Sequence, residues 1–134
     1  MKNKLIFAAM TAAAAFGCAT ASTVEMSDKA AERLAAFEPT GKTRSCMSLT
    51  AIRSIDALDE SRFLVEAAGG DYYLNTISGR CSGADRAGNR LQYTVTTGQL
   101  CRNEIITVVD NMSGFTVGSC GLGDFEELQE KPAE

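Results

Sequence analysis

The sequence predicts a mainly β domain, a small antiparallel barrel or sandwich of about six strands, with a short N-terminal helix and two disulfides. Short runs of alternating apolar and polar residues recur after position 46, and glycine-rich turns separate them. The folded part is only about 85 residues long, so its core is marginal on its own. Disulfides commonly supply the missing stability, and this part of the chain holds four cysteines: Cys46, Cys81, Cys101 and Cys120.

Residues 1–17 have the pattern of a secretory signal peptide. Lys2 and Lys4 give it a positive start, and the apolar run that follows is too short to remain as a membrane-spanning helix. Small residues surround Cys18, which becomes a lipid-modified first residue if this end is a lipobox. We favour lipidation of Cys18, and ordinary cleavage after Ala21 is the alternative.

The two processing routes predict different locations. A lipid-modified Cys18 anchors the mature protein in the membrane, on the periplasmic face of the outer membrane, whereas ordinary cleavage leaves it soluble in the periplasm. Without Lys2 and Lys4, 11 of the 13 basic residues remain against 17 acidic residues, which gives a net charge of −6. Because an acidic chain is a poor ligand for a polyanion, we expect no nucleic acid among its partners.

Residues 18–45 are predicted to form a tether that contains one short helix. Ser27 is a typical N-cap for a helix over residues 28–37, and Pro39 and Gly41 end that helix. The apolar stripe of the helix is narrow. We therefore expect the helix to pack on the outside of the domain rather than to bind a partner.

Residues 46–126 are predicted to form the disulfide-bonded β domain, and residues 127–134 a frayed acidic tail. Gly69-Gly70 is a two-residue hairpin signal, residues 78–89 form a polar loop, and residues 111–114 form a turn. The expected strands are a first one that contains Leu49, Ile52 and Ile55, and then residues 62–67, 72–77, 91–95, 104–110 and 115–119.

The four cysteines allow three pairings. In a plain six-strand meander, no scheme with two bridges fits well. If residues 54–61 instead cross the fold, Cys46 and Cys81 lie at one end and Cys101 and Cys120 at the other. We therefore favour the pairs Cys46–Cys81 and Cys101–Cys120.

Residues suited to catalysis or metal binding are scarce. The chain has no histidine, which removes His-based acid–base catalysis, His-activated nucleophiles and His metal sites. It also has no Cys-x-x-Cys motif. The adjacent carboxylates of Asp59-Glu60 and Glu126-Glu127 are expected to be solvated, because neighbours in a turn or tail do not face each other across a substrate. We therefore expect no catalytic residue, no metal and no cofactor, and a protein that is not an enzyme.

Tyr73, Asn75 and Arg80 are the best candidates for a binding surface. On a strand, Tyr73 and Asn75 share one face and Tyr72 takes the other. If the face with Tyr73 is exposed beside Arg80, it offers a flat polar and aromatic patch to a protein or a glycan. The alternative interpretation places one tyrosine in the core and the other at the rim.

Several motifs follow one another in a recognisable order from Cys46 to Phe125. The most specific are the four-cysteine frame and the ending Cys-Gly-Leu-Gly-x-Phe, and the other matches are Leu49, Ile52, Asp59, Tyr73-Leu74-Asn75, Leu100-Cys101 and Glu104-Ile105-Ile106. On these residues the segment resembles a family of short proteobacterial envelope proteins, the domain of unknown function six-four-nine-one. The family pattern tends to have Gly-Asp where this chain has Asn103-Glu104. The resemblance implies the architecture of the domain and its location as a lipoprotein, which supports lipidation of Cys18. It implies no activity.

Two classes of function follow from these observations. We expect an envelope lipoprotein without catalytic activity, whose domain is a periplasmic binding or structural module for an envelope protein or glycan. The alternative is an inhibitor of a basic cell-wall hydrolase such as lysozyme, because small acidic, disulfide-bonded β lipoproteins include such inhibitors. Ser78-Gly79-Arg80 is the nearest candidate for a loop that enters the cleft of a hydrolase.

Overall fold

The computed structural model describes residues 25–133, so the predicted signal peptide and the lipidation of Cys18 lie outside the described residues. Within this part, one helix and ten strands follow one another along the chain. The elements are α1 (Asp28–Ala35), β1 (Phe37–Arg44), β2 (Cys46–Ser48), the 3-10 turn η1 (Leu49–Ala51), β3 (Ile52–Ala57), β4 (Arg62–Ala67), β5 (Tyr72–Thr76), β6 (Asn89–Gln92), β7 (Gln99–Cys101), β8 (Ile105–Asp110), β9 (Thr116–Gly121) and β10 (Phe125–Glu130).

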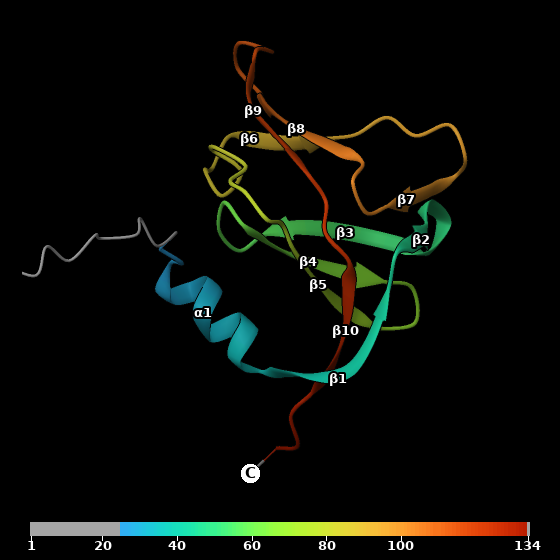
Figure 1. Ribbon diagram of the computed structural model, residues 1–134. Helices are drawn as coiled ribbons and strands as arrows, with labels where there is room; N and C mark the ends of the chain where they lie inside the picture. Colours follow the sequence, from blue (N-terminus) through green and yellow to red (C-terminus); the bar gives the residue numbers. More distant parts are fainter. Residues whose placement is uncertain (1–24, 134) are drawn as a thin grey trace, which may run out of the picture.

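The fold is mainly β, as predicted, and its antiparallel sheets pack as a sandwich without closing into a barrel (Figure 1). A five-stranded sheet in the order β1-β10-β5-β4-β3 forms one layer. The three-stranded sheet β6-β8-β9 and the two-stranded ladder β2-β7 lie over it. The β8–β9 hairpin extends to the end of the molecule that is opposite the C-terminus (Figure 1).

The main core lies between the two layers. Alternate residues of β4 contribute Phe63 and Val65, and β8 contributes Ile106 and Val108 from the opposite layer. These four side chains are almost completely buried. These alternate residues face the main core, as the period of two in a strand requires, and the strands predicted over residues 62–67 and 104–110 are confirmed. Leu64 is buried as well, on the opposite face of β4.

Helix α1 covers the outer face of the five-stranded sheet (Figure 1). Ser27 caps it as predicted, because the Ser27 hydroxyl accepts a hydrogen bond from the Ala30 N–H at 3.3 Å. The Arg33 guanidinium binds the Asp56 carboxylate of β3 at 3.1 Å. Beneath the helix is a second, smaller apolar cluster: Leu58, Leu64 and Leu128, with Met26, Ala30, Leu34, Phe37, Tyr72 and Leu74 against them.

Two segments that were predicted to lie outside the β domain are strands of the main sheet. Residues 37–44, assigned to the tether, form β1. Residues 125–130, assigned mostly to a frayed tail, form β10, which pairs with β1 on one side and β5 on the other. The prediction of a tether and a tail at these positions was therefore wrong, because both segments are paired in the main sheet.

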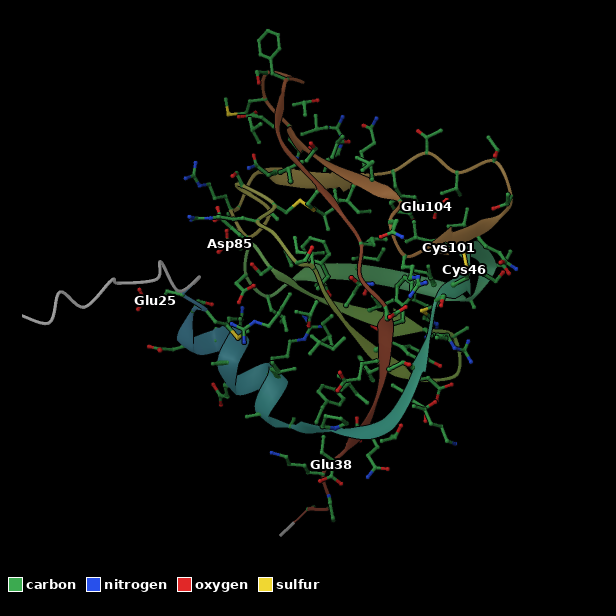
Figure 2. The ribbon with its side chains drawn as sticks, viewed as in Figure 1. Glu25, Glu38, Cys46, Asp85, Cys101 and Glu104 are labelled. Atoms are coloured by element: carbon green, nitrogen blue, oxygen red, sulfur yellow. A yellow bond between two sulfur atoms is a disulfide. The ribbon has the colours of Figure 1, made fainter. Side chains whose placement is uncertain are left out.

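The predicted disulfide pairing was also wrong. The bridges join Cys46 to Cys101 and Cys81 to Cys120. Cys46 and Cys101 are directly opposite each other in the β2–β7 ladder, with their Cα atoms 4.0 Å apart (Figure 2). The prediction failed because residues 54–61 do not cross the fold: β3 and β4 form a hairpin, with Ala57 opposite Phe63.

We expect the domain to need β10 to fold. Removing residues 125–134 deletes the buried Phe125 and Leu128 and opens both ladders that β10 makes. Each such large core side chain contributes roughly 2–5 kcal/mol, against a total stability of about 5–15 kcal/mol. Circular dichroism should therefore show no cooperative thermal transition for this truncation. Removing residues 131–134 alone should leave the transition in place, and a folded chain without β10 would contradict this account of the sheet.

Candidate functional site

The predicted trio of Tyr73, Asn75 and Arg80 does not form an exposed patch. Tyr73 and Asn75 share one face of β5, as predicted, but that face points into the core, and both side chains are buried. Arg80 is exposed and lies in the loop after β5. The interpretation that puts one tyrosine in the core and the other at the rim is the one that the structure supports, since Tyr72 is only partly buried, beneath α1.

Asn75 has a structural role. Its side-chain amide donates to the Gly123 carbonyl at 2.8 Å, and its carbonyl oxygen accepts from the Gly123 N–H at 2.8 Å. Gly123 sits so close to β5 that a Cβ added there would lie 2.1 Å from the Thr76 carbonyl oxygen. Asn75 therefore holds the link between β9 and β10 against the sheet, and no polar atom of it is free for a ligand.

Tyr73 borders a shallow cavity of about 340 Å³ at the edge of the main sheet. The Arg44 guanidinium lies 5.3 Å from the centroid of the Tyr73 ring, a cation–π arrangement. The ring therefore offers no open platform for stacking a sugar. The residues that line the cavity are Lys42, Thr43, Arg44, Tyr73 and Glu127.

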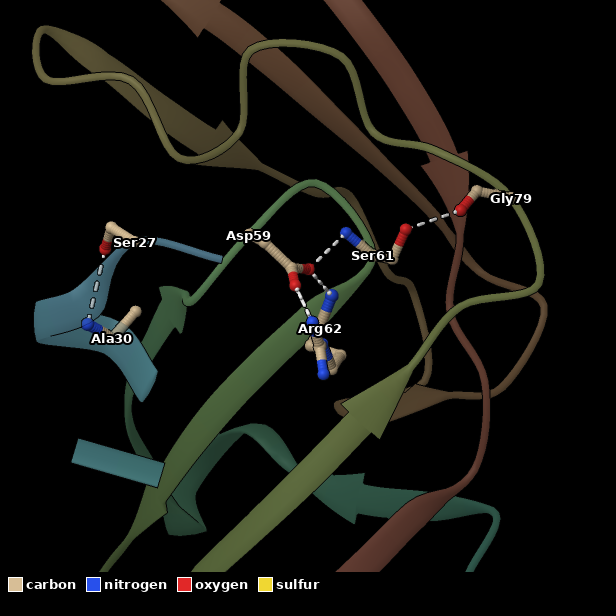
Figure 3. Close-up of polar contacts among 6 residues, drawn as sticks. All are labelled: Ser27, Ala30, Asp59, Ser61, Arg62 and Gly79. Carbon is tan, nitrogen blue, oxygen red and sulfur yellow. Dashed lines mark hydrogen bonds and ion pairs between the residues drawn. The ribbon is translucent and has the colours of Figure 1, made fainter. Parts of the chain in front are cut away.

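Asp59 and Glu60, which were predicted to be solvated, are buried in the turn between β3 and β4. The Asp59 carboxylate accepts the Ser61 and Arg62 N–H groups at 2.7 Å each and the Arg62 Nε at 2.7 Å (Figure 3). The Ser61 hydroxyl then donates to the Gly79 carbonyl at 3.0 Å (Figure 3). Asp59 thus fixes a turn that reaches across to the loop after β5.

Glu60 ties the same turn to the loop from the other side. Its carboxylate accepts the Gly83 N–H at 2.8 Å and pairs with the Arg80 guanidinium, and its backbone carbonyl accepts the Cys81 N–H at 2.6 Å. The bond from Gly83, and then the one from Arg80, lower the pKa of Glu60 below its ordinary value. Glu60 is therefore ionised at neutral pH and does not serve as a general acid there.

The exposed large apolar side chains of residues 25–133 all belong to the β8–β9 hairpin. Ile105 is 58 % exposed, Met112 98 %, Phe115 74 % and Val117 46 %. Met112, Phe115 and Val117 lie at or next to the tip of the hairpin, and we call these three residues the β8–β9 surface. Ile105 lies at the opposite end of β8. Exposed large apolar side chains that lie together, as those of the β8–β9 surface do, make a candidate interaction site.

The tip of the hairpin is an ordered turn. The Asp110 carboxylate accepts the Met112 N–H at 2.7 Å and the Ser113 N–H at 3.0 Å, and these bonds lower the pKa of Asp110. The Gly114 N–H donates to the Asp110 carbonyl at 2.8 Å. Gly114 has a φ of +74°, which an L side chain rarely adopts. Met112 and Phe115 are therefore displayed from a fixed backbone.

Two hollows flank this hairpin. A groove of about 460 Å³ runs along one side and is lined by Gln92, Tyr93, Thr94, Glu104, Ile105, Thr107 and Thr116. A cavity of about 280 Å³ near the tip is lined by Ser82, Gly83, Arg86, Ala87, Asn89, Asp110 and Val117.

Glu104, which lines the groove, has a structural role. Its carboxylate accepts the Cys101 N–H, so this acid caps the turn after β7 (Figure 2).

Sequence reasoning missed Met112 and Phe115 as candidate binding residues. The turn over residues 111–114 and the strand after it were predicted, and both are present. The available signal was Met112, a large apolar side chain inside a predicted turn. Phe115 alternates with Val117 in the predicted strand, so the sequence pattern did not signal its exposure.

Residues 25–133 contain no group of three or more His, Cys, Asp or Glu side chains placed to hold a metal ion. No helix among the described residues is long and apolar enough to cross a membrane.

The comparisons with known proteins give one match. The model of a family of unknown function (DUF6491) matches residues 1–131. No curated protein and no solved structure matches the chain.

We expect Glu60→Gln to reduce the amount of folding stability that the protein loses as the pH falls. Because the pKa of Glu60 is lower in the folded than in the unfolded chain, its charge stabilises the fold above the unfolded pKa, and this contribution is lost as the pH falls through the folded pKa. At neutral pH the variant should lose about 1 kcal/mol, a modest value because Arg80 is largely exposed. Thermal midpoints measured from neutral to acid pH should converge, and a gap that does not change with pH would contradict a role for the Glu60 charge.

Proposed function

We propose that this chain, which belongs to the family of unknown function DUF6491, is a non-catalytic binding module of the bacterial envelope that contacts its partner through the β8–β9 surface. The proposal rests on one observation: among the described residues, the exposed large apolar side chains all lie on one hairpin. The sequence supports the location, because residues 1–17 have the pattern of an export signal and Cys18 that of a lipid-modified residue.

The absence of catalytic activity is also part of the proposal. The chain has no histidine, and its four cysteines after Cys18 are held in bridges. The buried carboxylates of Asp59 and Glu60 are each occupied by an arginine and by backbone N–H groups. These contacts support a rigid scaffold, and the lowered pKa of Glu60 keeps that carboxylate ionised at neutral pH.

The alternative function, inhibition of a basic cell-wall hydrolase such as lysozyme, has one observation in its favour. Residues 78–80 form an exposed loop, and bonds from Ser61 to Gly79 and from Arg80 to Glu60 hold it in place. A rigid exposed loop is what insertion into a cleft requires. Loss of lysozyme activity on adding the purified protein, and its recovery with Ser78→Trp, would favour this alternative over contact through the β8–β9 surface.

Site-specific photo-crosslinking tests the proposed contact surface. A photoreactive residue at position 115 should crosslink to an envelope component in intact cells, because Phe115 is displayed at the tip. The same residue at Asp71, exposed in the turn between β4 and β5, is the matched control and should give no such product.

The double variant Met112→Ser with Phe115→Ser should reduce retention of the component that is crosslinked at position 115 by at least about tenfold, since buried apolar anchors dominate contact energies. Its thermal midpoint should stay near that of the wild type, because neither side chain packs in the core. Equal crosslinking at positions 115 and 71, or unchanged retention by the double variant, would refute contact through this surface.

A further inference from the structure

The tip of the β8–β9 hairpin combines two kinds of side chain. Met112 and Phe115 project into solvent with 98 % and 74 % of their surfaces exposed. Arg90 lies beside them, because its guanidinium donates to the Asn111 side-chain carbonyl at 2.8 Å. Arg86 lines the cavity that also contains Asp110 and Val117. The tip is therefore an apolar point with two arginines at its base.

Asp110 is the carboxylate of the turn itself and balances only one of the two arginines. The Asp110 carboxylate accepts hydrogen bonds from the N–H groups of Met112 and Ser113, and these bonds keep it within the turn. Asp85, beside Arg86 in the sequence, lines a different cavity, next to Lys29 and Arg33. Arg86 and Arg90 are both exposed. The tip is thus locally basic in a chain that is acidic as a whole, and its complement is an anionic surface.

The size and shape of the tip decide which kind of partner it fits. A stable protein–protein interface buries roughly 800 Å² on each partner. An aromatic side chain supplies roughly 150–250 Å² of this area, so two side chains on a protruding turn fall well short. A bilayer requires no matching pocket: apolar side chains enter the acyl boundary while neighbouring arginines meet the headgroup phosphates.

We infer that the β8–β9 tip inserts Met112 and Phe115 into a bilayer that contains anionic phospholipid, with Arg86 and Arg90 bound to its headgroup phosphates. This inference rests on the proposed function, because it names the partner of the β8–β9 surface. The ordered turn at Asp110 favours insertion, since the backbone loses little freedom when the tip binds.

Tryptophan fluorescence tests the insertion directly, because the chain has no tryptophan of its own. The protein is the exported chain with Cys18→Ser, so that no acyl anchor contributes to binding. Phe115→Trp puts the probe at the tip, and Ile105→Trp puts a matched probe at the other end of β8, also on an exposed side chain. The vesicles are an equal mixture of phosphatidylglycerol and phosphatidylethanolamine with brominated acyl chains, and phosphatidylcholine vesicles with brominated acyl chains are the neutral control.

We expect the emission of the tryptophan at position 115 to shift to the blue and to be quenched by the anionic vesicles, and not by the neutral ones. The tryptophan at position 105 should change little. Arg86→Gln with Arg90→Gln, in the Phe115→Trp background, should raise the half-saturating lipid concentration roughly 30-fold, equivalent to about 1 kcal/mol for each arginine. Arg53→Gln, an exposed arginine of β3, should have no such effect.

Equal quenching at positions 115 and 105, or equal quenching in anionic and neutral vesicles, would overturn the inference. If the tryptophan at position 115 is not quenched and the photoreactive residue at position 115 crosslinks to an envelope protein, membrane insertion is refuted while the proposed contact surface stands. If neither result is obtained, both the inference and the proposed function fail.

Discussion

The bridge between Cys81 and Cys120 is the constraint on which the presentation of the β8–β9 hairpin depends. Cys81 is fully buried in the loop after β5, and Cys120 lies on β9 opposite Ile106. The two layers of the sandwich belong to separate sheets, so no hydrogen-bonded ladder joins β9 to the main sheet. A covalent link therefore adds to the packed core in holding the layers together, and in a domain this small such a link commonly decides stability.

The turn of Asp59 and Glu60 strengthens the same junction from the main sheet. The Glu60 carbonyl accepts the Cys81 N–H, and the Glu60 carboxylate accepts the Gly83 N–H. A backbone carbonyl of the same loop, at Ser82, lies against Gly118 of β9, where an added Cβ would come within 2.3 Å of it. The buried carboxylates are thus used to position one loop, and that loop is the support on which β9 rests.

The sequence predicted some alternating strands well and the charged ones poorly. The alternating run over residues 91–95 overlaps β6 only at its first two residues, so that strand was placed too late in the chain. Residues 62–67 contain alternating core residues and were placed correctly, as was the helix start at Ser27. β10 was missed because four of its six residues are acidic or amide side chains, and only pairing with β1 and β5 makes it an interior strand of the sheet. β2 and β7 have three residues each, too few to show a period, and without them the Cys46–Cys101 pair is not apparent.

The candidate site was also predicted only as far as local sequence patterns allow. Alternation correctly put Tyr73 and Asn75 on one face but does not say which face meets the core, and the core was on their side. Exposure of Met112 and Phe115 follows from a hairpin that extends beyond the sandwich, which is a property of the assembled sheets and not of the local pattern. Periodicity describes single elements, whereas the surface that remains free depends on how all of them pack.

The central claim is that the Cys81–Cys120 bridge holds the β8–β9 hairpin to the rest of the sandwich, and native-state hydrogen exchange tests it most directly. The variant is the double change Cys81→Ala with Cys120→Ala. The account predicts that the amides of β8 and β9 lose at least about 30-fold in protection from exchange, which corresponds to about 2 kcal/mol for such a link. The amides of β4 and β5 should lose less protection. Unchanged protection in β8 and β9, or an equal loss in all four strands, would contradict it.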